Sequence, residues 1–425
     1  MNKLKEHRII NRMLDSIFQE KAFVEVSTFD DIKNLECIIS QELKLSRNQS
    51  MFMTLATRKI MVEVTKKLLI YYELQDAITF SELYSVVKKQ YENRLRLGEN
   101  NKNMIEEIHS NAKKEIKNFN YIACCEGISF EEVGFLDCGN YRVIQSDEDI
   151  FRRAYGKDDV NFFNRMNKYL WIQGKEIGSQ KKSAEKFHYI SNILTGFIGI
   201  CTQTINERLI LDYRIQVLNS SSSQKISSPS LSWLDEKKGG TFLYDLTSFR
   251  EIKLTSEIIN YFNKNLFFNN FFQVLQKDSQ NEIEEAVIKA VYWFSEATKD
   301  NNNTMKFIKL WSCVECFFSI SEKYISESNA KGLASILVYG GFQIYSVEEY
   351  KSLKIHIKNL YTKRSKALHR AYWSEIDEDD VVNLANWSAW LIINVLALKV
   401  LSNYTKLKEI IEQAKRLDEI HERLS

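Results

Sequence analysis

The sequence predicts a mainly α-helical protein in three parts: a helical region over residues 1–119, a small α+β module over 120–275 and a helical bundle over 280–425. Apolar residues recur every three or four positions in the first and last parts, which is typical of half-buried helices. The middle part has glycines between short β-branched and aromatic runs, as in strands and turns. A single proline in 425 residues leaves long helices unbroken. This length suits two or three domains.

In the N-terminal region the helical spacing is clearest from Met51 to Leu74, and Ser81–Tyr91 and Asn103–Ile116 are expected to be further helices. The turn-rich segment LGENNKN, Leu97–Asn103, separates the last two. We therefore expect residues 1–119 to be mostly helical.

The middle module begins where the pattern changes near Tyr121. Strands and turns are expected over Cys124–Ile144, and a helix over Ser183–Ile198. Phe262–Leu275 suits either the last helix of this module or part of the next core. The remaining expected elements are strands at Leu209–Leu218 and Gly240–Tyr244, separated by a polar loop, Asn219–Ser230, which holds the proline.

The C-terminal part is helical nearly throughout, with short connections that predict a compact bundle. Its expected helices are Glu282–Thr298, Thr304–Tyr324, Asn329–Tyr339, Val347 to about Leu368, Glu378–Tyr404 and Lys406–His421.

The bulk composition favours a soluble, cytoplasmic protein. Its formal net charge of +2 does not mark the whole chain as nucleic-acid-binding, so any basic surface must be local. Seven cysteines without regular spacing argue against a disulfide framework. The N-terminus has no apolar signal core, and the longest apolar run, Leu391–Leu401, is too short to span a bilayer. No membrane partner is expected.

One arginine falls on an apolar stripe of the bundle. Leu353, Ile357, Leu360 and Leu368 define the stripe of the helix that starts at Val347, and Arg364 lies on it. The helix Thr304–Tyr324 likewise carries Glu315 within the stripe of Ile308, Trp311 and Phe318. A buried charge is costly unless it is partnered. We therefore predict a Glu315–Arg364 contact that fixes the guanidinium.

His369 follows Arg364 by five residues, about 140° around a regular helix, so the two converge only if the helix ends near Leu368. Ser374 or Asp377 is expected to cap the next helix. The segment Lys351–Arg370 contains seven basic residues and no acid, and is therefore expected to attract a phosphate backbone. For the outer lysines a solvated helix face is the favoured interpretation.

Two segments resemble a known superfamily. RSKALHR, from Arg364 to Arg370, resembles the R-x4–6-H motif of HEPN (higher eukaryotes and prokaryotes nucleotide-binding) ribonucleases. FIKLWSCVECFFSI, from Phe307 to Ile320, is similar to the first large helix of the Apea-like branch, where an acidic residue corresponds to Glu315. Ser365 departs from the Asn, Asp or His that many members carry there. The resemblance covers about 280–405.

This resemblance implies a metal-independent endoribonuclease without cofactor, in which two copies form a cleft and each contributes an Arg–His pair. It further implies RNA, with tRNA as one candidate, as the substrate, and a role in bacterial antiphage defence by abortive infection. Residues 1–270 would then restrain or direct the nuclease, with a phage-derived activator as the trigger. The resemblance and the basic segment together assign catalysis to Arg364, His369 and Glu315, and substrate binding to Lys363, Ser365, Lys366, Arg370 and Tyr372.

Other interpretations remain open. A non-catalytic HEPN fold could serve dimerisation or nucleotide or RNA recognition as a scaffold. A metal-dependent nuclease in the middle module is disfavoured because no acidic cluster has catalytic spacing. Cys313 and Cys316 form C-x2-C, but packing is favoured over zinc because no second pair lies nearby. His356 is expected at a helix surface or an interface.

Overall fold

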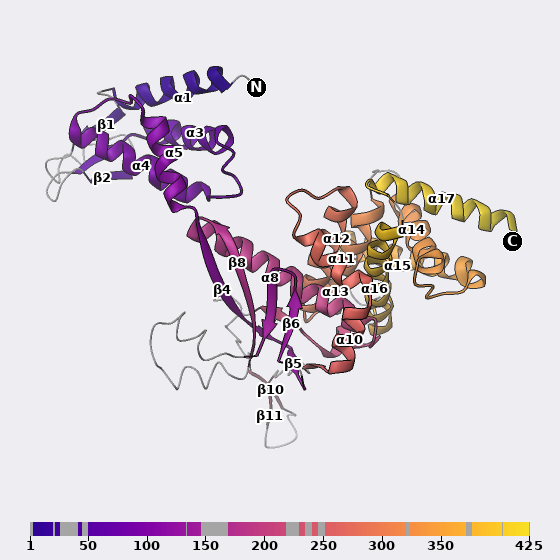
Figure 1. The fold of residues 1–425 in the computed structure, drawn as a ribbon. Helices are drawn as coiled ribbons and strands as arrows, with labels where there is room; N and C mark the ends of the chain where they lie inside the picture. The colour runs from indigo at the N-terminus through magenta and orange to yellow at the C-terminus, as the bar shows by residue number, and fades with distance from the viewer. Residues whose placement is uncertain are drawn as a thin grey trace. The chain divides into compact units, whose positions relative to one another are not determined.

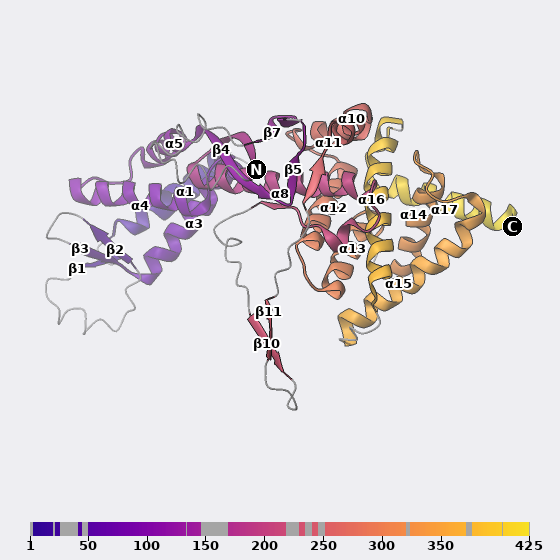
Figure 2. The same cartoon turned by 90° about the horizontal axis from the view of Figure 1, so that it is seen from below.

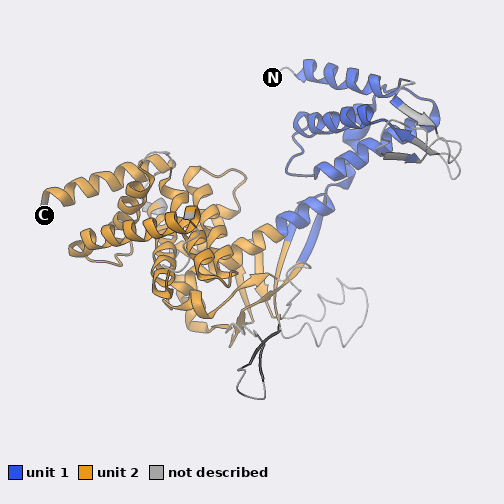
Figure 3. Cartoon of the chain, turned by 180° about the vertical axis from the view of Figure 1, so that it is seen from behind, with its two compact units in different colours: residues 1–121, 175–187 blue, residues 122–174, 188–425 orange. Residues whose placement is uncertain are grey.

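The computed structural model describes residues 3–19, 22–25, 41–44, 50–132, 134–145, 169–217, 229–233, 240–244, 251–319, 324–370, 376–401 and 403–424. It divides into two compact units, drawn in separate colours in Figure 3. Unit 1 comprises residues 1–121 and 175–187, and unit 2 comprises 122–174 and 188–425. The first division lies close to the expected boundary at 119, whereas the expected middle module and C-terminal bundle fall largely within one unit.

The described residues of unit 1 form four whole helices, the start of a fifth, α8 (Gln180–Gln203), and a small antiparallel sheet with strand order β1-β3-β2 (Figure 1). Its apolar stripes meet in one core that includes Leu14, Met61, Leu68, Leu83 and Ile108. The elements are α1 (Lys3–Ile17), β1 (Phe23–Glu25), β2 (Gln41–Lys44), β3 (Ser50–Met53), α3 (Leu55–Tyr71), α4 (Phe80–Leu97) and α5 (Met104–Glu115).

The helix expected from Met51 begins later, at Leu55. Thr54 takes an extended backbone conformation and its hydroxyl accepts a hydrogen bond from Thr57 N, which caps α3. The preceding residues pair with two neighbouring strands instead, so Met51–Met53 is strand and not helix. Apolar spacing alone did not separate the two states, because the pairing partners lie elsewhere in the sequence.

The largest sheet among the described residues has five strands in the order β6-β7-β8-β4-β9. Its strands are β4 (Lys117–Glu126), β6 (Phe135–Cys138), β7 (Tyr141–Ile144), β8 (Leu170–Gly178) and β9 (Gln216–Val217). Buried and exposed residues alternate along β6 and β7, as expected for strands with one covered face. Strands and turns over Cys124–Ile144 are thus confirmed. Two strand pairs complete the β structure: β5 (Ile128–Phe130) lies parallel to β12 (Ile252–Leu254), and β10 (Pro229–Trp233) lies antiparallel to β11 (Gly240–Tyr244).

Two expectations in the middle region need correction. Leu209–Leu218 is not one strand, because α9 (Leu209–Asp212) occupies its first part and, of the described residues that follow, β9 is the strand. Residues 219–228 of the expected loop Asn219–Ser230 lie outside the described residues. Its last two residues, Pro229 and Ser230, belong to β10. Proline fits there as the first residue of a strand.

Unit 2 is mainly helical, and Figures 1 and 2 show α12, α13, α15 and α16 alongside one another. The expected helix Glu282–Thr298 has the same bounds as α12. Asn281 and Glu284 form a capping box at its N-terminus. The helices are α8 (Gln180–Gln203, shared with unit 1), α10 (Ser256–Lys264), α11 (Leu266–Leu275), α12 (Glu282–Thr298), α13 (Asn303–Phe318), α14 (Ile325–Tyr339), the 3-10 turn η2 (Val347–Glu349), α15 (Tyr350–Arg370), α16 (Glu378–Leu401) and α17 (Leu407–Leu424).

The phenylalanines of α11 lie in the core of unit 2. Phe267, Phe268, Phe271 and Phe272 are all at most 5% exposed, and the ring of Phe271 stacks 3.8 Å from that of Phe197. The helix also packs on α16. These side chains therefore form part of the packed core.

Among the described residues one segment, Glu378–Leu398 in α16, is long and apolar enough to cross a membrane. Most of it is buried inside the structure, which is typical of a core helix in a soluble protein.

Candidate functional site

The candidate site lies where α13 and α15 pack together. The buried face of α15 carries Tyr350, Leu353, Ile357, Leu360 and Ala367, each at most 5% exposed. Leu368, expected on this stripe, is 44% exposed, because Ala367 is the residue two turns after Leu360. The stripe therefore continues through an alanine and leaves Leu368 beside it.

The predicted Glu315–Arg364 contact is confirmed. Arg364 Nη2 donates a hydrogen bond of 2.9 Å to Glu315 Oε2. The side chains of Arg364 and Glu315 are 18% and 19% exposed, so both are partly buried at the edge of the helix packing. A charge-assisted hydrogen bond in such a half-buried place is stronger than a surface ion pair.

Tyr361 completes this contact, although it is not among the site residues predicted from the sequence. Its hydroxyl donates a hydrogen bond of 3.2 Å to Glu315 Oε1, so the carboxylate accepts from two side chains of α15. The guanidinium of Arg364 lies 5.5 Å from the centre of the Tyr361 ring, within cation–π range. The three-residue spacing between Tyr361 and Arg364 could have indicated that Tyr361 belongs to the site, since residues three apart share a helix face.

Trp311 supports the tyrosine from α13. The two rings meet edge to face with centres 5.1 Å apart and an interplanar angle of 89°. Burial, followed by the charge of Glu315, raises the pKa of Tyr361 above its ordinary value. The phenol therefore stays protonated near neutral pH and remains a hydrogen-bond donor to Glu315.

Arg364 retains unused donor capacity. Its Nε is buried, and no partner for it lies among the described residues. A buried N–H without an acceptor costs about 1–3 kcal/mol. The arrangement thus fixes the guanidinium on one side through Glu315 and leaves a donor for which the described residues supply no acceptor.

His369 is exposed and lies within α15, which continues to Arg370. The expectation that the helix ends near Leu368 is therefore wrong by two residues. His369 leaves the helix about 140° away from Arg364, and no contact between the two side chains occurs in the described part of the chain. A single chain does not bring the predicted pair together.

The expected substrate-binding residues lie in different settings. Lys363 Nζ contacts Asp380 Oδ2 at 2.6 Å, and Asp380 and Asp377 cap the start of α16 reciprocally, which confirms Asp377 as the cap. Ser365 and Lys366 are half-buried on α15. The side chain of Arg370 and all of Tyr372 lie outside the described residues.

The basic segment of α15 is largely compensated by acids from other helices. Lys354 contacts Asp418 at 2.6 Å, and Lys358 contacts Glu327 at 2.8 Å. Lys363 and Arg364 have the partners named above, so at least four of the seven basic residues form ion pairs. The surface therefore attracts a phosphate backbone less strongly than the sequence alone predicts.

Cys313 and Cys316 pack within α13, as expected. Cys313 is fully buried, and burial raises the pKa of the Cys316 thiol to about 11. Neither is suited to act as a thiolate near neutral pH. Across the described residues, no three His, Cys, Asp or Glu side chains are grouped to hold a metal ion.

His356 is exposed on α15, and its ring lies edge to face against that of Trp387, with 5.2 Å between the ring centres.

Comparison with protein-family models, with curated proteins and with solved structures found no match.

Proposed function

We propose that this protein is a metal-independent endoribonuclease of the HEPN type, acting in the cytoplasm as a homodimer. The single observation that carries the proposal is the Glu315–Arg364–Tyr361 arrangement, in which a fixed arginine keeps a buried donor that has no acceptor among the described residues. A phosphate oxygen is the acceptor that a guanidinium matches best.

In the proposed reaction, the 2′-hydroxyl of a ribose attacks the adjacent phosphorus atom and the P–O5′ bond breaks. The products are a 2′,3′-cyclic phosphate and a 5′-hydroxyl. Arg364 stabilises the negative charge that builds on the phosphate oxygens in the transition state. His369 moves a proton during attack or departure, as histidine side chains do in general acid–base catalysis. The reaction therefore requires only side-chain groups.

The separation of Arg364 and His369 on α15 is consistent with a site completed by a second copy. In this arrangement two α15 helices meet, and the Arg–His pairs of both subunits line one cleft. Lys363, Ser365, Lys366, Arg370 and Tyr372 are the proposed substrate contacts. Residues 1–270, with a phage-derived activator as their proposed trigger, would control the nuclease in abortive infection.

The test incubates the full chain with total RNA and with tRNA in the presence of EDTA. Wild type is compared with Arg364→Ala, His369→Ala and the control Lys351→Ala, which removes a charge from an exposed position of the same helix. Cleavage by wild type and the control that both site variants lose, with 2′,3′-cyclic phosphate ends, supports the proposal. Cleavage that survives both site substitutions, or that EDTA abolishes, contradicts it.

A second candidate is an RNA- or nucleotide-binding scaffold without catalysis. The exposed position of His369, away from Arg364, favours it, because recognition needs the arginine but not the histidine. This candidate predicts that RNA binds to wild type and to His369→Ala equally, is lost in Arg364→Ala, and is never cleaved.

A further inference from the structure

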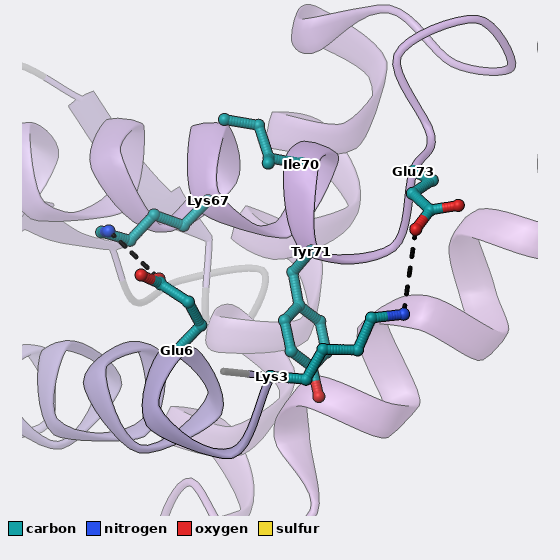
Figure 4. Close-up of a pocket in the computed structure, with 6 residues that line it drawn as sticks. All are labelled: Lys3, Glu6, Lys67, Ile70, Tyr71 and Glu73. Carbon is teal, nitrogen blue, oxygen red and sulfur yellow. Dashed lines mark hydrogen bonds and ion pairs between the residues drawn. The ribbon is translucent and has the colours of Figure 1, made fainter. Parts of the chain in front are cut away.

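Unit 1 contains a cavity of about 250 Å³ between the first turns of α1 and the last turn of α3. Figure 4 shows the ring of Tyr71 between two ion pairs, with Ile70 on the neighbouring position of α3. The cavity thus combines an apolar wall with charges of both signs. Its lining residues are Lys3, Glu6, Lys67, Ile70, Tyr71 and Glu73.

The two ion pairs differ in strength. Lys67 Nζ and Glu6 Oε2 lie 3.3 Å apart, and the side chains are 34% and 17% exposed. This partly buried pair closes one end of the cavity. Lys3 and Glu73 lie 3.8 Å apart and are 74% and 81% exposed. An exposed pair of this kind contributes little to stability. The ammonium of Lys3 and the carboxylate of Glu73 are therefore readily drawn to a ligand.

The backbone at Glu73 is an independent sign of function. Its φ is +55°, in the left-handed region that favours glycine. It occupies the position after the C-cap of α3, where Glu73 N donates to Ile70 O at 3.2 Å and Leu74 N donates to Leu69 O at 2.9 Å. Glycine is the usual residue at this place in a Schellman motif. A side chain held there against its backbone preference points to a use for that side chain.

The apolar wall of the cavity is available for contact. Ile70 is 58% exposed, so its side chain gains burial when a ligand covers it. The Tyr71 ring packs edge to face against the Tyr72 ring, with ring centres 4.8 Å apart, and the centre of the His7 ring lies 6.1 Å from its own. The wall is therefore preformed, which lowers the entropy cost of binding.

We propose that this cavity binds a free α-amino acid with an apolar side chain. Its carboxylate pairs with Lys3, its ammonium pairs with Glu73, and its side chain lies on Ile70 and Tyr71. The ammonium and carboxylate of an α-amino acid are about 3 Å apart, close to the Lys3–Glu73 spacing, whereas a diamine or a dicarboxylate leaves one of these charges unmatched. The cavity is also smaller than the roughly 300–1,000 Å³ of pockets for drug-sized ligands.

The test titrates L-phenylalanine and L-leucine into the full chain by isothermal calorimetry. The analogues 3-phenylpropionate and 2-phenylethylamine each lack one of the two charges. Each is expected to bind at least about tenfold more weakly than L-phenylalanine, because one charge-assisted hydrogen bond is lost. Analogues that bind as tightly as the amino acid, or no saturable heat from either amino acid at millimolar concentration, overturn the proposal.

The decisive variant is Glu73→Gly. It removes the carboxylate and relieves the left-handed backbone, so it is expected to unfold at the same or a higher temperature while losing amino-acid binding. The matched control is Glu63→Gln, whose carboxylate pairs with Lys66 on the same helix and does not line the cavity. Unchanged affinity in Glu73→Gly contradicts the proposal, whatever the stability of the variant.

Discussion

Helix α15 carries two charge clusters that look alike in the sequence but differ in how fully they are satisfied. Near its start, the carboxylate of Asp418 is 1% exposed and is contacted by Lys331 at 2.8 Å, Lys354 at 2.6 Å and the hydroxyl of Tyr350 at 3.0 Å. Near its end, Glu315 is 19% exposed and holds Arg364, whose Nε has no partner among the described residues.

The difference separates a structural network from a candidate site. The Asp418 cluster joins α14, α15 and α17, and each of its cations already faces an acid. Such a buried, complete network holds helices in place. The Glu315 cluster fixes a cation without using all of its donors, and this is the arrangement that a ligand can complete.

The largest effect is expected for Asp418→Ala, which leaves Lys331 and Lys354 without their buried partner. Breaking a buried charge network typically costs about 3–5 kcal/mol. Chemical denaturation, followed by tryptophan fluorescence, measures the loss. The control is Glu422→Ala, since Glu422 is 59% exposed and its pair with Lys354 should contribute less than about 1 kcal/mol. Equal effects of the two substitutions would show that Asp418 is not the centre of a buried network.

The next effect concerns Arg364→Ala, which is expected to reduce RNA cleavage by about 10²–10³-fold, as when one charge-stabilising donor is removed from an active site. Its effect on unfolding should be much smaller than that of Asp418→Ala, because Glu315 keeps Tyr361 as a donor. Initial cleavage rates and denaturation midpoints of the same samples compare the two. A large loss of stability with intact cleavage would assign Arg364 to structure alone.

A smaller effect is expected for Tyr361→Phe, which keeps the ring against Trp311 and removes only the hydrogen bond to Glu315. A hydrogen bond to a charged group contributes about 1.5–3 kcal/mol, so cleavage should slow by roughly 13–160-fold. Tyr339→Phe in α14 is the matched control, since that hydroxyl contacts His421, away from α13. Rates that do not distinguish the two variants would remove Tyr361 from the site.

The smallest effect is a pH dependence of stability. Burial by itself would raise the pKa of Asp418, but hydrogen bonds from Lys331, Lys354 and Tyr350 outweigh it, and the pKa lies below its ordinary value. A lowered carboxyl pKa stabilises the folded state above the unfolded pKa, about 3.9, and this contribution is lost as pH falls through the folded pKa. Denaturation midpoints from pH 6 to about pH 3 should fall less steeply in Asp418→Asn than in wild type. Parallel curves would exclude this linkage.

The helices of unit 2 and the Glu315–Arg364 contact were predictable because both follow from local spacing. Helical periodicity places Glu315 and Arg364 on inward faces, and an inward charge requires a partner. The pairing of β3 was not predictable from helical spacing, since Ser50–Met53 lies between β1, about 25 residues earlier in the sequence, and the nearby β2. The compensation of Lys354 and Lys358 was equally hidden, because their acids lie on α17 and α14.

The end of α15 shows a third limit. Two residues more of helix decide whether His369 can turn toward Arg364, and helix ends are the least certain feature of a sequence pattern. Tyr361 was accessible in principle, because it lies one turn before Arg364, but its role depends on the reach of Glu315 from another helix.

The most direct measurement of the central distinction is the affinity for a 2′-O-methyl RNA, which cannot supply the attacking hydroxyl, at one fixed salt concentration. Arg364→Ala and Lys358→Ala each remove one positive charge from α15, but only Arg364 belongs to the unsatisfied cluster. The account predicts that Arg364→Ala weakens binding by about tenfold or more, while Lys358→Ala stays close to wild type. Equal weakening by both variants would mean that RNA senses only the charge of the helix, and would contradict a site at Arg364.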